Sequence, residues 1–151
     1  MKHIFLGSDH AGYKLKQTVK SYLDSLHTPY TDLGNAQLDP ADDYPDYALL
    51  VAKAVVEQRG MGILICGSAM GVCIAANKVK GTRATAVFTT REAQLSREHN
   101  DANILCLSGW DTSPAKAKAI IRTWLKTEFS GLKRHARRIQ KIKKIESGEL
   151  K

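Results

Sequence analysis

Hydrophobic positions along the chain alternate between short, continuous apolar runs and longer segments with helical spacing. Runs of strand length lie at positions 4–6, 30–33, 62–66, 85–88 and 104–107. Between most of them, apolar residues recur every three or four positions, which is typical of helices that bury one face. The run at 62–66 is apolar throughout, as expected of a strand buried on both faces. The pattern predicts an α/β fold: a three-layer, Rossmann-like sandwich with a five-stranded parallel sheet.

Several helix starts are marked by capping residues. Asp43 and Ser113 each precede a proline that would lie in a first helical turn. Thr89 and Glu92 have the spacing of a capping box. Positions 70–79 also have helical character. The helix after Asp43 is expected to bury Ala48, Leu49, Ala52, Val55 and Val56.

The composition is that of one globular domain, which we place at 1–151, with 43% hydrophobic and 25% charged residues. The N-terminal apolar stretch is too short for a signal peptide, and no apolar run approaches membrane-spanning length. The three cysteines, Cys66, Cys73 and Cys106, form no CxxC pair, so neither a disulfide framework nor a metal site is indicated. We therefore expect a reduced, cytoplasmic protein without membrane contact.

The formal net charge of +8 is concentrated near the C-terminus. Positions 133–144 carry seven Lys or Arg residues and no acid, and a basic helix is predicted over about 133–146. Arg134 and Arg138 lie one turn apart on one face of this helix, a spacing suited to gripping a phosphate. A solvated basic helix face is the alternative interpretation.

The turn after the third predicted strand is a candidate ligand site, because ligands of parallel α/β sheets bind outside the carboxyl ends of the strands. Cys66 ends this strand and is followed by the turn Gly67–Gly71, which leads into a helix. Amides at a helix start favour anions and stabilise a thiolate, which makes Cys66 a candidate base or nucleophile. Free cysteine is also among the most buried residue types, so inert core is the alternative. On that ground we assign Cys73 and Cys106 to the core.

Two histidine-containing segments flank the predicted sheet. Asp9 and His10 follow the first strand at the same edge as Cys66, where they either face a ligand or form a surface turn. His99 and Asn100 precede the fifth strand, so within one chain they lie at the opposite edge. They can join Cys66 only if the preceding helix is short or if a second subunit supplies them. Capping of a helix end is the other interpretation.

Six short motifs share an order and spacing that chance would not produce. They are Gly7-Ser8-Asp9-His10-Ala11-Gly12, Asp43-Tyr44-Pro45, Cys66-Gly67-Ser68 with Gly71, Ile74-Ala75-Ala76-Asn77-Lys78, His99-Asn100-Asp101 and Arg134-His135-x-x-Arg138. Over nearly its whole length, the chain resembles the type B ribose-5-phosphate isomerases and the related galactose-6-phosphate isomerase subunits. The resemblance implies a homodimer, often paired into a tetramer, with active sites built from both chains. It also implies that the C-terminal helix packs on the partner subunit.

The reaction implied by the resemblance interconverts an aldose phosphate and a ketose phosphate through an enediolate, without metal or organic cofactor. In that scheme Cys66 removes the proton on carbon 2, and His99 is the acid–base group of ring opening. Amides of the Gly67–Gly71 turn, with Asn100, stabilise the developing negative charge. Ser68 lies beside the catalytic pair and, with Asp9, binds sugar hydroxyls. Tyr44 lies in the substrate pocket, and His10, Arg134 and Arg138 bind the phosphate.

Three positions depart from the family pattern. Val72 stands where one branch of the family carries a glutamate base instead of the cysteine, so no carboxylate competes with the thiol here. Trp110 stands where an arginine often adds a phosphate contact, so phosphate binding relies more on Arg134 and Arg138. Ala69 replaces a usual glycine and narrows the conformational freedom of the turn.

The sequence favours D-ribose 5-phosphate and D-ribulose 5-phosphate as the interconverted pair. Trp110 and Ala69 leave open a six-carbon substrate such as allose or galactose 6-phosphate. A non-catalytic module that docks nucleic acid through the basic tail is a different class of function, but the tail lacks aromatic residues that stack on bases. A thiol redox protein is disfavoured because no second cysteine lies close to Cys66 in sequence, although Cys73 could approach in space.

Overall fold

A computed structural model describes residues 3–150, and within them the chain forms a five-stranded parallel sheet with helices on both faces. The strands are β1 (Ile4–Ser8), β2 (Tyr30–Asp32), β3 (Met61–Cys66), β4 (Ala84–Ala86) and β5 (Ile104–Ser108), and the helices are α1 (His10–Ser25), α2 (Tyr44–Gln58), α3 (Met70–Ala76), α4 (Thr90–Asn100), α5 (Pro114–Lys126) and α6 (Lys133–Glu146). The strand order is β2-β1-β3-β5-β4, and each neighbouring pair is parallel. The predicted fold class is confirmed.

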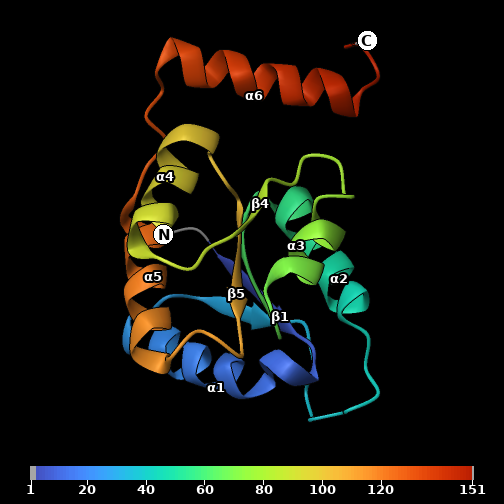
Figure 1. Cartoon of the computed structure of the whole chain (residues 1–151), viewed down its shortest axis with the longest axis vertical. Coiled ribbons are helices and arrows are strands. Elements are labelled where there is room, and N and C mark those ends of the chain that lie inside the picture. The colour runs from blue at the N-terminus through green and yellow to red at the C-terminus, as the bar shows by residue number, and fades with distance from the viewer. Residues whose placement is uncertain (1–2, 151) are drawn as a thin grey trace.

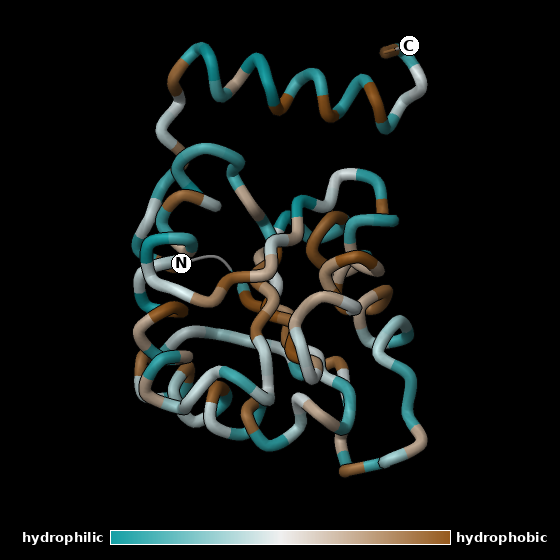
Figure 2. Tube along the Cα trace, viewed as in Figure 1, coloured by the Kyte–Doolittle hydropathy of each residue, from teal (hydrophilic) through white to brown (hydrophobic). Residues whose placement is uncertain are grey.

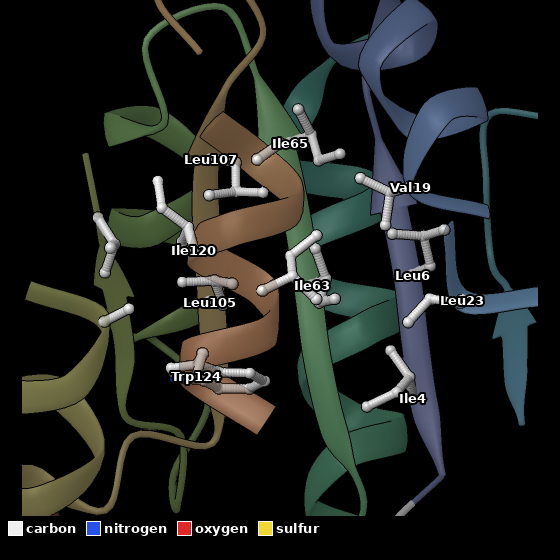
Figure 3. Close-up of a cluster of buried hydrophobic side chains, with 14 of the residues drawn as sticks. Ile4, Leu6, Val19, Leu23, Ile63, Ile65, Leu105, Leu107, Ile120 and Trp124 are labelled. Carbon is white, nitrogen blue, oxygen red and sulfur yellow. The ribbon is translucent and has the colours of Figure 1, made fainter. Parts of the chain in front are cut away.

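Two hydrophobic cores lie on opposite faces of the sheet. Helices α1 and α5 cover one face, α2 and α3 cover the other, and α4 packs beside α5 (Figure 1). In β3, Ile63 and Ile65 point into the first core, while Leu64 and Cys66 point into the second. Figure 3 shows the first core, where Trp124 of α5 lies against the strands. Burial of alternate residues on two faces explains why β3 is apolar at every position.

Helix α6 stands apart from these layers and lies across one end of the molecule, next to α4 (Figure 1). Near its C-terminal end, the Glu146 carboxylate accepts a hydrogen bond from the Gly81 amide at 3.2 Å. Figure 2 shows this helix as mainly hydrophilic, with a few hydrophobic positions. Two of these, Ile142 and Ile145, are 39% and 62% exposed. The apolar side of α6 is therefore only partly covered by its own chain.

Capping residues begin the helices where the sequence predicts. The side chains and amides of Thr89 and Glu92 form the complete capping box of α4. Ser113 Oγ accepts a hydrogen bond from the Lys116 amide at 3.3 Å at the start of α5. Asp43 occupies the N-cap position of α2, but its side chain makes no capping hydrogen bond. Within residues 3–150, no helix has both the length and the apolar character needed to cross a membrane.

The predicted buried face of α2 is wrong at two positions. Leu49 and Val56 are 43% and 38% exposed. The residues that α2 buries are Ala48, Val51, Ala52 and Val55. Their spacing of three and four residues keeps them on one side of the helix, whereas Leu49 and Val56 each follow a buried residue and are rotated by about 100° from it.

The predicted bounds of α3 and β4 extend too far. Helix α3 ends before Asn77, whose side-chain amide exchanges two hydrogen bonds with the backbone of Ala84 in β4, at 2.8 and 2.9 Å. Strand β4 stops short of Phe88 and Thr89 because the Glu92 carboxylate accepts hydrogen bonds from both amides, at 2.7 and 2.9 Å. At β4 a side chain captures backbone amides beyond the end of the strand, and at α3 the residue that follows the helix is tied to the neighbouring strand by its side chain.

Candidate active site

Cys66 is the last residue of β3 and is 4% exposed. Across the sheet it pairs with Ser108, the last residue of β5. On its other side, the Asp9 amide after β1 donates a hydrogen bond to the carbonyl of Ile65 at 3.3 Å. The carboxyl ends of three strands therefore meet around this thiol, at the edge of the sheet where α/β proteins bind ligands.

The turn that follows β3 leaves backbone amides available at the start of α3. Ala69 is the N-cap of α3 and has a φ of 68°, in the left-handed region. That conformation costs an alanine about 1 kcal/mol relative to glycine. The first hydrogen bond within α3 runs from the Cys73 amide to the Ala69 carbonyl at 3.3 Å, so the Gly71 amide has no partner inside the helix. Ser68 Oγ accepts a hydrogen bond from the Met70 amide at 3.4 Å.

Two aromatic rings pack directly on the glycines of this turn. A Cβ atom added to Gly67 would lie 2.5 to 2.7 Å from the indole of Trp110, and one added to Gly71 would lie 2.8 to 3.1 Å from the ring of Tyr44. A side chain larger than hydrogen at either position would require the neighbouring ring to move. Trp110 is 74% exposed, so most of its surface faces outward beside the Cys66 turn.

Hydrogen bonds hold the turn against the end of β5. The Ser108 hydroxyl donates to the Gly67 carbonyl at 2.7 Å. The Gly109 amide donates to the Cys66 carbonyl at 2.8 Å, and the Trp110 amide donates to the Gly67 carbonyl at 3.1 Å. These bonds use backbone groups and a serine only. The turn is therefore held in place by hydrogen bonds that do not involve the Cys66 thiol.

Asp9 and His10 are fixed at the same edge by neighbouring polar groups. Asp9 is 5% exposed, and its Oδ1 caps α1 by accepting a hydrogen bond from the Gly12 amide at 2.9 Å. Burial raises the pKa of Asp9. The exposed His10 ring places Nδ1 2.7 Å from Oδ1 of Asp42, and this hydrogen bond raises the pKa of His10. The imidazolium form, which attracts anions, is thereby favoured.

His99 and Asn100 lie at the opposite edge of the sheet from Cys66. They close α4, which leads into the start of β5, whereas Cys66 ends the neighbouring parallel strand. The parallel pairing of β3 with β5 extends over five residues, which corresponds to about 13 Å along the strands. The separation expected from βα geometry is therefore present within one chain.

His135 organises the second cluster. Its ring packs on that of His99, with centroids 4.3 Å apart. Its Nδ1 lies 2.8 Å from Ser130 Oγ, and its Nε2 accepts a hydrogen bond from Arg134 Nε at 3.2 Å. Burial, with the nearby charges, lowers the pKa of His135. A neutral ring that donates from Nδ1 and accepts at Nε2 satisfies both contacts.

The residues predicted to bind phosphate are divided between the two edges. His10 lies with Cys66, whereas Arg134 and Arg138 lie on α6, one turn apart and exposed. Arg134 is linked to His99 through the ring of His135. One chain therefore holds two incomplete clusters: thiol, acid and His10 at one edge, and His99, Asn100 and two arginines at the other.

Sequence reasoning missed the supporting roles of three residues. Asp42 lies in a segment predicted only as polar loop, and its contact with His10 joins positions far apart in sequence. His135 is visible as part of a motif, but its packing on another histidine is not. From the sequence, Trp110 is interpreted only as the absence of a family arginine, and not as an aromatic ring that packs on the turn. One core assignment needs correction: Cys73 is half-buried, because α3 turns it toward the edge of β4, while Cys106 is fully buried as predicted.

Two features that often locate active sites do not mark either cluster. A cavity of about 750 Å³ is lined by residues of α1, α5 and the start of β3, among them Tyr22, Leu125 and Met61, and by none of the predicted site residues. Among residues 3–150, no group of three or more His, Cys, Asp or Glu side chains is placed to hold a metal ion. The site is recognised by its chemistry at the strand ends instead.

Comparison with known sequences matches almost the whole chain. The Ribose/Galactose Isomerase family model matches residues 4–142. The probable ribose-5-phosphate isomerase B of Mycoplasma pneumoniae is 44% identical over 144 residues, which cover 94% of each chain. Identity at this level over the full length of both chains implies a common fold and a common ancestor.

Solved structures agree with this relationship. Ribose-5-phosphate isomerase B of Clostridium thermocellum superposes with a TM-score of 0.93 at 44% identity, covering 97% of this chain and 98% of that one. The enzyme of Mycoplasma genitalium, solved with bound ribulose-5-phosphate, superposes with a TM-score of 0.92 at 44% identity, covering 96% of each chain. By sequence and by fold, this chain belongs to the ribose/galactose isomerase family.

Proposed function

We propose that this protein is an aldose–ketose isomerase that interconverts D-ribose 5-phosphate and D-ribulose 5-phosphate through an enediolate. The observation that carries the proposal is the Cys66 turn, where a thiol at the carboxyl end of β3 is followed by helix-start amides. Membership of the family supports the reaction class. The names of the relatives, and the ribulose-5-phosphate bound to the Mycoplasma genitalium protein, support the choice of substrate.

Cys66 acts as the carbon base. As a thiolate it takes the proton from carbon 2 of the open-chain aldose and returns it to carbon 1 of the enediolate. The negative charge that develops on the sugar oxygens is stabilised by amides of the turn, including Gly71, and by Asn100. Ser68 and Asp9 hold sugar hydroxyls next to the thiol. The bracing from β5 supports this role, because a base must be held within hydrogen-bond reach of the proton that it removes.

His99 opens the sugar ring. It transfers a proton between the carbon 1 hydroxyl and the ring oxygen, which an imidazole near neutrality can do in both directions. The packing of its ring on His135 supports this role, because a general acid–base group needs a fixed orientation. His135 is itself held by Ser130 and Arg134.

The substrate phosphate is bound by His10, Arg134 and Arg138. The hydrogen bond to Asp42 favours the charged form of His10, and two arginines one turn apart can share the oxygens of one phosphate. Trp110 contributes no cation to this group. We expect its exposed indole to border the sugar, opposite Tyr44.

The working site is shared between two subunits of a homodimer. Cys66, Asp9 and His10 come from one chain, and His99, Asn100 and the two arginines come from the second. This arrangement joins two clusters that one chain holds at opposite edges of its sheet. The partly uncovered apolar side of α6, with Ile142 and Ile145, supports a role for this helix in packing on the partner subunit.

The test is a comparison of catalytic efficiencies on a panel of sugar phosphates. The panel contains ribose 5-phosphate, ribulose 5-phosphate, allose 6-phosphate and galactose 6-phosphate, with the Cys66→Ala protein prepared in parallel to exclude a contaminating isomerase. We expect the highest kcat/KM with the five-carbon pair. Higher efficiency with a six-carbon phosphate would overturn the substrate and keep the reaction class, whereas no turnover of any member would overturn both.

A further inference from the structure

The fold gathers all three cysteines of the chain on one side of the sheet. Cys66 in β3 and Cys106 in β5 both point toward α2 and α3, and Cys73 lies on α3. Cys106 pairs with Leu64, two residues before Cys66. The sequence separates these thiols by as many as 40 positions (66 to 106), so their proximity arises only on folding.

Cys73 has the surroundings of a reactive thiol. It is half-buried, with its Sγ 3.3 Å from the Ala84 carbonyl and 3.7 Å from Nδ2 of Asn77. Chiefly because of a hydrogen bond with the Cys106 thiol, the pKa of Cys73 is lowered to about 7. The lowered pKa increases the fraction of Cys73 that is thiolate, the form that reacts with oxidants.

Cys106 has the opposite character. It is fully buried, and burial raises its pKa well above the ordinary value for a thiol. It therefore remains protonated and is shielded from reagents in solution. Its immediate partner is the thiol of Cys73. The two side chains thus combine an accessible thiolate with a protected second thiol.

We propose that Cys73 and Cys106 are a reversible oxidation site, which a hydroperoxide converts to an intramolecular disulfide. Cys73 is the reacting thiol and Cys106 the resolving one. The isomerase mechanism proposed above uses neither residue, and the oxidation site does not depend on which sugar phosphate the protein converts.

The reaction balances in two steps. The Cys73 thiolate attacks hydrogen peroxide, so that an S–O bond forms, the O–O bond breaks, and the departing hydroxide takes up a proton to become water. Cys106 then attacks the Cys73 sulfur, forming the S–S bond and breaking the S–O bond, and its proton leaves with the second oxygen as water. Two thiols lose two electrons and two protons in total, and the peroxide is reduced to two molecules of water.

The sheet register explains why Cys66 is not the partner. Cys66 and Cys106 are diagonal neighbours on adjacent strands, which places their Cβ atoms roughly 7 Å apart. A disulfide needs Cβ atoms about 3.8 Å apart, and paired strands of a sheet cannot close that gap without breaking their hydrogen bonds. Cys73 is carried on a helix of seven residues that packs on β4 and β5, so it is not held by the strand register that separates Cys66 from Cys106.

The test measures thiol content and mass of the full-length protein after treatment with hydrogen peroxide. We expect a mass loss of about 2 Da, reversed by dithiothreitol, and differential alkylation that maps the bond to Cys73 and Cys106. Cys66→Ala should form the same bond. Cys73→Ser should show no mass loss, and Cys106→Ala should instead gain about 16 Da at Cys73, the mass of a sulfenic acid.

Three results would overturn the proposal. They are full retention of the Cys73 and Cys106 thiols by the wild-type protein after treatment with hydrogen peroxide, an unchanged mass loss in Cys73→Ser, and a bond that includes Cys66. Circular dichroism of each variant, recorded before oxidation, verifies that the thiols are compared in folded proteins. None of these readouts requires isomerase activity, so the failure of this proposal and the failure of the proposed function are distinguishable.

Discussion

The two edges of the parallel sheet carry clusters of different construction. At the carboxyl edge, Cys66 is 4% exposed, and the turn after it is braced by hydrogen bonds from Ser108 and Gly109. At the opposite edge, His99 packs on His135, and the arginines lie exposed on α6, a helix outside the layered body. One cluster is held in place by hydrogen bonds of its own chain, and the other presents its functional groups outward.

In the proposed shared site, this difference separates the parts that a single chain organises from those that a second chain would complete. A thiol that removes a proton from carbon needs close positioning, which the buried strand end supplies. Exposed cations and a partly uncovered apolar helix are typical of a surface that another subunit covers. The variants below test whether the two clusters act on one substrate, in order of decreasing expected effect.

The largest effect is expected from Cys66→Ala. Loss of the carbon base should lower kcat by about 10³-fold, within the range of acid–base groups, while the fold persists because little core volume is removed. Steady-state kinetics in both directions measure this, with Cys73→Ser as the control thiol. Retention of more than about one hundredth of wild-type kcat would remove Cys66 from the role of base.

His99→Asn should separate ring opening from proton transfer. With ribose 5-phosphate, which is mainly cyclic, kcat/KM should fall about a hundredfold. The kinetic isotope effect on kcat/KM with ribose 5-phosphate deuterated at carbon 2 should shrink, because ring opening then limits the rate more than removal of the carbon 2 proton does. The exposed His27, changed to Asn, serves as the matched control. An isotope effect that rises above the wild-type value would show that His99 acts in the proton transfer itself.

The double change Arg134→Ala and Arg138→Ala should act on binding. Loss of two exposed phosphate contacts, at about 1 kcal/mol each, should raise KM about thirtyfold with a smaller effect on kcat. Lys141→Ala with Lys144→Ala removes the same charge from the same helix and should leave KM unchanged. If both double variants behave alike, α6 is a solvated basic helix and does not grip the phosphate.

The smallest effect is expected from Trp110→Arg. Restoring a cation beside the turn should lower KM for ribose 5-phosphate about fivefold, the equivalent of about 1 kcal/mol. Trp110→Phe keeps an aromatic ring and should leave KM near the wild-type value. A rise in KM for the arginine variant, with the phenylalanine variant unaffected, would indicate that the packing of the indole on Gly67 contributes more than any phosphate contact.

The fold could be predicted from the hydrophobic pattern because the central strands β1, β3 and β5 are buried on both faces and the helices packed on the sheet bury one. The thiol at the end of β3, and the opposite placement of His99, follow from the same βα geometry. The errors in α2 concern single positions. Leu49 and Val56 are as apolar as their buried neighbours, and only the three-dimensional packing decides which side of the helix faces the sheet.

The supporting contacts could not be predicted, because they join distant segments through side-chain geometry. Asp42 reaches His10 from a loop, and Trp110 packs on Gly67 from the neighbouring strand end. Neither contact leaves a periodic signal in the sequence. The sharing of one site by two chains has no signal either. We propose it from the family resemblance together with the separation of the clusters in a single chain.

The most direct test of a shared site is complementation between two inactive variants. Cys66→Ala and His99→Asn subunits are unfolded together, refolded as an equal mixture and assayed with ribose 5-phosphate. In a mixed dimer, one site receives both defects, and the other receives an intact Cys66 and an intact His99. The account predicts recovery of about a quarter of wild-type activity, because half of the dimers are mixed and each has one working site. Activity no higher than the average of the two variants alone, with mixed dimers verified by mass, would contradict the shared site.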